Sequence, residues 1–301
     1  MSALPTHVRL IEVGPRDGLQ NEPLFVPTQT KIEFIDLLSQ TGLSIIESGS
    51  FVSAHAIPQL ADSERVFQTI KKSANISYPV LVPNLQGLER ALSVNAKHIA
   101  LFASASETFS QKNINCSIKE SLSRFKEIMN VAKPKKLTIR AYVSCVLGCP
   151  YEGNVKPQAV ADLCAALYEM GADEISLGDT IGIGTPHQTQ TLIELVMQSV
   201  PANNIAMHFH NTYGQAIANI YASLELGINK FDSAVAGLGG CPYAKGATGN
   251  VASEDVLFLL KGLGIETGVD LLKLAHAGDF ICKKLGRRNN SLVGTALLGS
   301  T

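Results

Sequence analysis

Residues 205–211 read Ile-Ala-Met-His-Phe-His-Asn, an apolar run that closes on two histidines and an asparagine. A short apolar run of this kind is typical of a β-strand. Side chains two positions apart on a strand share a face, so His208 and His210 are expected to point the same way. Two adjacent imidazoles at a strand end can hold one divalent metal ion, but they can also be unrelated histidines of a partly buried strand. The rest of the chain decides between these interpretations.

Short apolar or β-branched runs recur along the chain and alternate with helical patterns. We predict strands at residues 8–13, 44–47, 78–82, 98–102, 137–143, 174–177, 205–210 and 230–235. Amphipathic helices are predicted at 28–41, 118–132, 157–170, 188–200 and 213–226, and again at 253–262 and 269–284. Gly42, Gly171 and Gly227 stand where three of these helices should stop, because glycine tolerates the left-handed conformation.

This alternation predicts the fold class, an α/β protein built as a (β/α)8 TIM barrel with additional C-terminal helices. We expect one catalytic domain over residues 1–301, with a helical extension from about 253 to 301. The alternative is an open doubly wound sheet. Such a sheet usually has fewer strands, and its glycine-rich dinucleotide-binding turn is missing after the first predicted strand.

Composition excludes several kinds of partner. The 301 residues are 46% hydrophobic and carry a formal net charge of −1, so no basic face for nucleic acid is expected. The first residues do not resemble a secretory signal, and no apolar stretch is long enough to span a membrane. We therefore expect a cytoplasmic protein with no membrane partner, in which the six cysteines do not form disulfides.

In a TIM barrel the active site lies where strands end and the following loops begin. The first predicted strand runs into Gly-Pro-Arg-Asp-Gly-Leu-Gln at residues 14–20. Asp17 can offer a hard oxygen ligand, and Arg16 can polarise a carbonyl or clamp a carboxylate. The alternative is a surface turn in which the two charges pair with each other.

Further charged residues mark other strand ends. Glu47 follows the second strand and is either solvated or an acid that supports a metal site. Arg140 stands inside an apolar run, so it should pair with Glu47 or another carboxylate at the barrel mouth. Asp179 ends the sixth strand and either accepts a hydrogen bond from a ligand histidine or caps the next helix.

A loop with five glycines follows the last predicted strand, at residues 237–250. Such a segment can be a mobile lid or can bring backbone close to a ligand. Cys241 in its middle is either an acid/base group or an inert thiol. Together with Asn250 at the end of this loop, the mixed nitrogen and oxygen donors Asp17, His208 and His210 favour Mg²⁺ or Mn²⁺.

Three motifs resemble those of the 3-hydroxy-3-methylglutaryl-CoA lyase family. They are Glu-Val-Gly-Pro-Arg-Asp-Gly-Leu-Gln-Asn-Glu at 12–22, His-Phe-His-Asn-Thr-Tyr-Gly-Gln at 208–215, and the loop Gly-Leu-Gly-Gly-Cys-Pro-Tyr-Ala-Lys-Gly-Ala-Thr-Gly-Asn at 237–250. The similarity runs over residues 8–285. Isopropylmalate and homocitrate synthases share the Arg-Asp-Gly-x-Gln and His-x-His elements. They usually read His-x-His-Asn-Asp, and their later loop carries no Gly-Gly-Cys-Pro. The chain shows no mitochondrial leader and no cysteine after Cys282, so the bacterial type of this family fits better.

The resemblance implies cleavage of 3-hydroxy-3-methylglutaryl-CoA into acetyl-CoA and acetoacetate. It implies a divalent cation, Mg²⁺ or Mn²⁺, held by Asp17, His208, His210 and Asn250. Catalytic roles are expected for Arg16, which would neutralise enolate charge, and for Cys241, His208, Glu47 and Asp179. Cofactor-binding residues are predicted to be Arg16, Gln20 and Ser50.

We expect a small-molecule acyl-CoA substrate and a homodimer or higher homo-oligomer. Two alternatives keep the fold. One is a lyase or Claisen-type synthase that acts on another 3-hydroxyacyl-CoA, and the other is a non-catalytic barrel that binds CoA esters. The intact set of charged and metal-binding residues argues against the second alternative.

Overall fold

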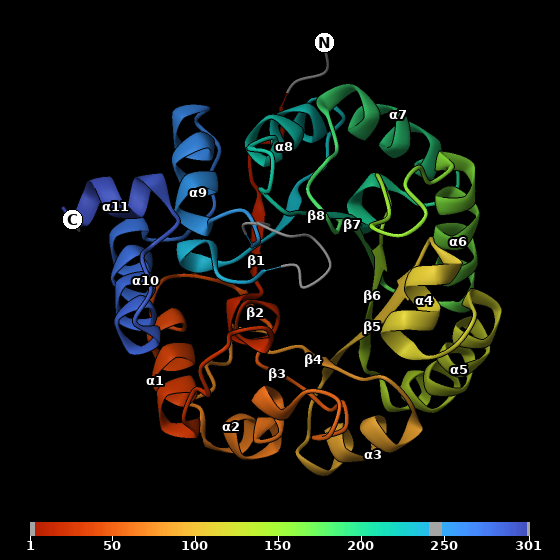
Figure 1. Ribbon diagram of the computed structural model, residues 1–301, viewed down its shortest axis with the longest axis horizontal. Helices are drawn as coiled ribbons and strands as arrows, with labels where there is room; N and C mark the ends of the chain where they lie inside the picture. Colours follow the sequence, from red (N-terminus) through yellow and green to blue (C-terminus); the bar gives the residue numbers. More distant parts are fainter. Residues whose placement is uncertain (1–3, 241–248, 300–301) are drawn as a thin grey trace.

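The computed structural model, which describes residues 4–240 and 249–299, shows a parallel sheet that closes on itself (Figure 1). Its strand order is β2-β1-β9-β8-β7-β6-β5-β4-β3, and its two ends are two pieces of one chain segment. Only Glu47 and Ser48 separate those pieces. The Glu47 N–H donates to Glu12 O at 2.9 Å on one side, and the Ser48 N–H donates to Pro79 O at 2.9 Å on the other. The predicted eight-stranded barrel is therefore confirmed, with its second strand split in two.

The split strand gives the sheet nine segments in all. The strands are β1 Arg9–Glu12, β2 Ile45–Ile46, β3 Gly49–Ser50, β4 Val80–Leu81, β5 His98–Ser104, β6 Thr138–Ser144, β7 Glu174–Asp179, β8 Ile205–Phe209 and β9 Lys230–Ser233. The helices are α1 Thr28–Leu38, α2 Ser63–Thr69, α3 Leu85–Ser93, α4 Glu107–Ile114, α5 Ile118–Ala132, α6 Pro157–Met170, α7 Pro186–Val196, α8 Ala216–Glu225, α9 Ser253–Gly262, α10 Leu271–Leu285 and α11 Leu292–Leu298.

Local sequence chemistry explains where several helices start and stop. Pro157 opens α6, where its missing N–H costs nothing, and Gly171 closes it at φ 102°. A capping box between Ser117 and Glu120 opens α5. Gly42 and Gly227 also have positive φ, as predicted for residues that stop helices. The predicted stops at Gly171 and Gly227 are confirmed, whereas α1 ends before Gly42, at Leu38 with Ser39 as its C-cap.

The helices form a ring around the barrel, and the C-terminal ones fill the gap in it between α8 and α1 (Figure 1). Helix α9 packs against α8, α10 packs against α1, and α11 packs on α9 and α10. The predicted C-terminal helices are therefore part of the wall that supports β9 and β1.

The sequence did not predict helices α2, α3, α4 and α11, which are short or follow brief loops. Helix α4 matters most, because it stands beside the carboxyl ends of the strands. Within residues 4–240 and 249–299 there is no helix with the length and apolar character needed to cross a bilayer. The five cysteines described by the structure are all free and buried.

Candidate active site

A single π-helical turn, η1 Gly14–Gly18, carries Arg16 and Asp17 at the end of β1. The N–H groups of Arg16, Asp17 and Gly18 all converge on Val13 O, at 3.2, 2.7 and 3.2 Å. A Cβ on Gly18 would lie 2.8 Å from Leu238 Cβ, so the turn can only pack this closely with glycine there. Isolated π-turns are frequent at functional sites, and this one holds two charged side chains at the barrel mouth.

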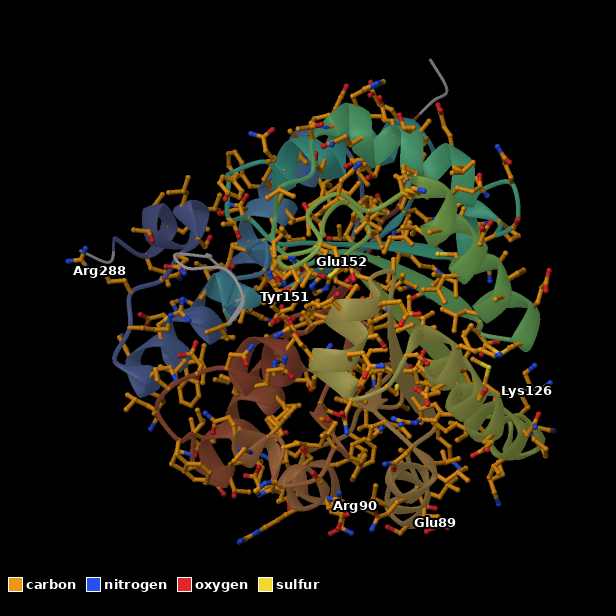
Figure 2. All side chains as sticks on the ribbon, turned by 45° about the vertical axis from the view of Figure 1, so that its right-hand side comes forward. Glu89, Arg90, Lys126, Tyr151, Glu152 and Arg288 are labelled. Carbon is orange, nitrogen blue, oxygen red and sulfur yellow. The ribbon has the colours of Figure 1, made fainter. Side chains whose placement is uncertain are left out.

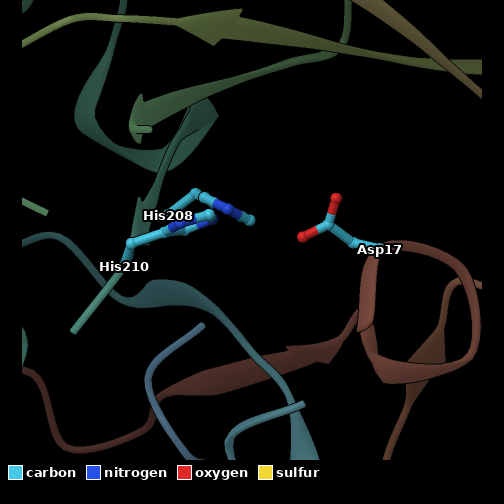
Figure 3. A group of neighbouring side chains, drawn as sticks. All are labelled: Asp17, His208 and His210. Carbon is cyan, nitrogen blue, oxygen red and sulfur yellow. The ribbon is translucent and has the colours of Figure 1, made fainter. Parts of the chain in front are cut away.

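Asp17, His208 and His210 come together at this mouth (Figure 3). Each offers one ligand atom, and these atoms lie within 4.8 Å of one another. The two imidazole rings lie 5.3 Å apart, and both point toward the Asp17 carboxylate. The prediction that both histidines share one face of the strand is confirmed.

The charges of this cluster suit metal coordination. Burial, together with the nearby His208, lowers the pKa of His210 to about 4, so its lone pair is free at neutral pH. Burial alone would raise the pKa of Asp17, but Arg16, the two histidines and the Asn250 amide outweigh it and lower the pKa to about 2. The site therefore offers an ionised carboxylate beside a neutral imidazole.

Asn250 lies at the edge of the cluster. Its Nδ2 donates to Asp17 Oδ2 at 2.9 Å and to Leu238 O at 3.1 Å, and its backbone forms a bridge with His210. The amide therefore orients the Asp17 carboxylate. The four residues predicted to hold the metal are gathered in one place.

Arg16 lies between two carboxylates. Its Nε and Nη2 bind Glu47 Oε2 at 2.9 and 2.8 Å, and its Nη1 binds Asp17 Oδ1 at 2.7 Å. The Tyr142 hydroxyl also donates to Glu47 Oε2, at 3.1 Å. Each terminal nitrogen of the guanidinium carries a second N–H that these contacts do not use. Arg16 is thus held as a cation with donors left for a ligand.

A cavity of about 420 Å³ opens beside the cluster. Its polar wall contains Arg16, Asp17, Gln20, His208 and His210. The ends of β5 and β6, helix α4 and the loop after β3 also line it, through Phe102, Tyr142, Phe109, Lys112, Asn113, Val52, Ala56 and Ile57. The cavity therefore joins the candidate metal group to a mixed apolar and cationic surface.

The remaining predicted residues differ in how close they come to this cavity. Gln20 lines it and donates to Asp17 Oδ1 at 3.2 Å. Ser50 does not line it: its N–H binds Ser63 Oγ at 3.1 Å, and its own hydroxyl accepts from the Val52 N–H at 3.3 Å. Glu47 is fully buried and does not line the cavity, but it binds two residues that do, Arg16 and Tyr142. Cys241 lies outside the described residues.

Asp179 does not contact a ligand histidine in the way we predicted. Its carboxylate accepts from the N–H groups of Gly184 and Ile183, at 2.9 and 3.3 Å, in the loop after β7. Burial raises the pKa of Asp179 to about 6 despite these bonds. The carboxylate that meets a ligand histidine is Asp232 in β9, whose Oδ2 lies 3.2 Å from His208 Nδ1.

The prediction that Arg140 pairs with Glu47 was also wrong. Arg140 pairs with Asp232 and lies 3.3 Å from Glu174 Oε1, whereas Glu47 is bound by Arg16. The reason is the position of Arg140 in the barrel. It lies near the amino end of β6, where its partner in the register of β6 and β7 is Glu174. Another arginine, Arg288, lies exposed at the outer edge of the molecule, away from the cavity lining (Figure 2).

Two groups of site residues were not singled out from the sequence. Lys112 and Asn113 enter the cavity from α4, a helix that was not predicted. Tyr142 and Asp232 sit inside strands that read as apolar. An acidic residue within an apolar strand was the signal for Asp232, since buried carboxylates normally have a partner.

The residues present fit a divalent metal ion. The Nδ1 atom of His210 is buried and has no hydrogen-bond partner among the described residues. Buried polar atoms normally have a partner, and a metal ion bound in the cluster would help to explain why this histidine is buried without one. Two imidazoles and a carboxylate leave coordination positions open, in contrast to a closed structural zinc site.

Comparisons with known proteins agree with this geometry. A family model described as HMGL-like matches residues 7–281. The 3-hydroxy-3-methylglutaryl-CoA lyase of Rattus norvegicus named as cytoplasmic is 56% identical over 98% of this chain and 86% of its own length. Similar relatives are named as mitochondrial.

Solved structures give the same result. A hydroxymethylglutaryl-CoA lyase from Pseudomonas aeruginosa superposes with a TM-score of 0.97 at 56% identity, covering 99% of both chains. A lyase described as from Acenitobacter baumannii, solved with coenzyme A and 3-methylmalate, has a TM-score of 0.93 at 38% identity, covering 98% of this chain and 97% of its own.

Proposed function

The chain belongs to the HMGL-like family, and we propose that its cavity cleaves 3-hydroxy-3-methylglutaryl-CoA into acetyl-CoA and acetoacetate. It is a hydroxymethylglutaryl-CoA lyase by its similarity over nearly its whole length. The observation that carries the proposal is the convergence of Arg16 with Asp17, His208 and His210 on one cavity.

The reaction needs stabilisation of negative charge at two places, first on the tertiary hydroxyl oxygen and second on the thioester oxygen. The tertiary hydroxyl loses its proton as the neighbouring carbon–carbon bond breaks, and the hydroxyl carbon becomes the ketone of acetoacetate. The electron pair of the broken bond moves onto the acetyl-CoA fragment as an enolate. A proton then returns to the enolate carbon.

Arg16 meets the second need. Arg16 lines the cavity, and its remaining N–H donors are proposed to bind the thioester oxygen there as negative charge grows on it. Glu47 and Asp17 hold the guanidinium in place from two sides, so little reorganisation is needed during the reaction. Arg16 is therefore the proposed catalytic group for the enolate.

Asp17, His208 and His210, with Asn250 supporting Asp17, would hold the divalent ion. When bound, that ion supplies Lewis-acid polarisation of substrate oxygens. We propose Mg²⁺ or Mn²⁺, because the donor set has no thiolate and leaves positions open for oxygen ligands. Cys241 is proposed as the group that returns the proton to the enolate carbon.

Substrate binding is proposed to follow the cavity walls. The relative solved in complex with coenzyme A supports an acyl-CoA as the ligand. Gln20 lines the cavity, whereas buried Ser50 would have to act through the backbone around it. A single catalytic domain, a homo-oligomer, the catalytic roles of Glu47, Asp179 and His208, and a cytoplasmic location stay predictions.

The test is a coupled assay of acetoacetate release from 3-hydroxy-3-methylglutaryl-CoA with Mg²⁺ or Mn²⁺. A panel of other 3-hydroxyacyl-CoA thioesters is run beside it. We expect acetoacetate and acetyl-CoA in equal amounts, and the highest kcat/KM on 3-hydroxy-3-methylglutaryl-CoA. A higher kcat/KM on another thioester would show that this thioester is the substrate. No turnover with any divalent ion would overturn the proposal.

A further inference from the structure

Asp232 is a buried carboxylate that touches a proposed metal ligand and that no motif of the chain singled out. Its side chain is fully buried inside the barrel. Residues His208 and Asp232 are direct partners in the parallel pairing of β8 and β9, so their side chains stand at the same level. Asp232 Oδ2 lies 3.2 Å from His208 Nδ1.

Other contacts fix the orientation of this carboxylate. The Ser176 hydroxyl in β7 donates to Asp232 Oδ2 at 2.8 Å, and Arg140 in β6 pairs with the other oxygen, Oδ1. Donors from two neighbouring strands therefore hold both oxygens. The carboxylate cannot turn away from His208 without breaking one of these contacts.

An anionic acceptor at Nδ1 determines which nitrogen of a neutral imidazole carries the proton. The proton stays on Nδ1, and the lone pair lies on Nε2. His210 differs, because its Nδ1 has no partner among the described residues. The two histidines of the cluster are therefore not equivalent: only His208 has its tautomer set by a carboxylate.

We propose that Asp232 is a positioning residue for the metal site, which accepts the Nδ1–H of His208 and so directs the Nε2 lone pair toward Asp17 and His210. This inference rests on the proposed function in one respect, that the cluster binds a divalent cation. It assigns Asp232 no contact with the substrate.

The competing interpretation is that Asp232 only balances the charge of Arg140. Glu174 allows the two interpretations to be separated, because it is the second carboxylate beside Arg140 and has no contact with His208. Asp232→Asn and Glu174→Gln each remove one negative charge next to the same arginine. Only the first change affects the histidine tautomer.

The experiment measures Mn²⁺ affinity by electron paramagnetic resonance without substrate, so it does not depend on turnover. For Asp232→Asn we expect a loss of about 10- to 100-fold, because the amide can donate to Nδ1 and favour the Nε2–H tautomer. Glu174→Gln should stay within about twofold of the unmodified protein. Equal losses in both variants, or no loss in Asp232→Asn, would overturn the proposal.

A second measurement covers the case in which Asp232→Asn does not fold. Nitrogen-15 NMR of the histidine side chains in the unmodified, metal-free protein should show His208 protonated on Nδ1, and Ser176→Ala should keep this tautomer. Protonation on Nε2 would overturn the proposal. If the protein binds Mn²⁺ but releases no acetoacetate, the proposed function fails while the role of Asp232 stands.

Discussion

Arg16 and Arg140 are two arginines of nearly equal burial that flank the same tyrosine and face different ends of the barrel. Each is 6% exposed, and their guanidinium carbons lie 5.4 and 4.8 Å from the centre of the Tyr142 ring. Each also lies beside two carboxylates, Asp17 and Glu47 for one and Asp232 and Glu174 for the other.

Position along the barrel axis separates their functions. Arg16 lines the cavity at the carboxyl ends of the strands, together with the metal-binding cluster. Arg140 lines a second cavity, of about 490 Å³, at the amino ends, where Glu174 is also bound by Lys230 at 2.6 Å. Charge and burial alone thus do not identify a catalytic arginine. Arg16 is identified because the same cavity contains side chains that can bind a metal ion.

Removal of the metal ion should abolish activity at the carboxyl ends of the strands and leave the fold of the barrel unchanged. After treatment with a strong chelator we expect complete loss of acetoacetate release, because the carboxylate and imidazoles would lose the ion that polarises the substrate. The far-UV circular dichroism should not change, and Mg²⁺ or Mn²⁺ should restore the rate. Activity that persists in the chelated protein would contradict the proposal that the cluster at the carboxyl ends of the strands holds a catalytic metal ion.

Arg140→Gln should act mainly on stability. It leaves the fully buried Asp232 without its cation, which we expect to lower the free energy of unfolding by about 3–5 kcal/mol. Urea unfolding measures this loss. The matched control is Arg288→Gln at the exposed outer edge, which should stay within about 0.5 kcal/mol. Similar stabilities of both variants would contradict the distinction between the two arginines.

Arg16→Gln should act mainly on the rate. Loss of a donor aimed at developing negative charge lowers kcat by about 10²- to 10³-fold, or about 2.7–4 kcal/mol of transition-state stabilisation. Arg16→Lys keeps the charge but not the forked geometry, so it should recover only part of the rate. Steady-state kinetics at saturating metal measure both. A kcat within tenfold of the unmodified enzyme for Arg16→Gln would remove Arg16 from the mechanism.

The last expected effect, the smallest per pH unit, concerns two buried carboxylates that form no ion pair with an arginine. Burial raises the pKa of Glu12 from 4.5 to about 7 and that of Glu254 from 4.5 to about 8. Both hold their protons more tightly in the folded protein than in the unfolded chain. Their contribution to stability is therefore fully present below about pH 4.5 and is lost as the pH rises through about 7–8.

Glu254→Gln is the sharpest variant for this effect, because its amide oxygen can still accept from the Ala236 N–H. We expect the fall in unfolding free energy with rising pH to become shallower by up to about 1.4 kcal/mol per pH unit between roughly pH 5 and pH 8. Denaturant titrations across this range measure the slope. An unchanged slope would show that Glu254 titrates normally in the folded protein.

Much of this fold could be predicted because its signals are local. Pro157, Gly171 and the β-branched runs determine where elements begin and end without help from distant residues. His208 and His210 could be placed on one face because strand alternation is a fixed period. Once the barrel was predicted, the turn with Arg16 and Asp17 could be assigned to the same mouth.

The errors involve contacts that depend on the tertiary structure. Asp179 in β7 and Asp232 in β9 are acidic residues on the two strands that flank β8, and only the register of β8 shows which of them meets His208. The pairing of Arg140 likewise depends on its height in the barrel. Ser50 lies in β3, beyond the break at Glu47 and Ser48, and is absent from the cavity lining: its N–H binds Ser63 Oγ and its hydroxyl accepts from the Val52 N–H.

The most direct test of the whole account is a crystal structure of the protein grown with Mn²⁺, with data collected at the manganese absorption edge. We predict one strong anomalous peak at about 2.0–2.3 Å from Asp17, His208 and His210, on the cavity side that Arg16 faces. A peak at another site, or none at this cluster under conditions where the enzyme is active, would contradict the account.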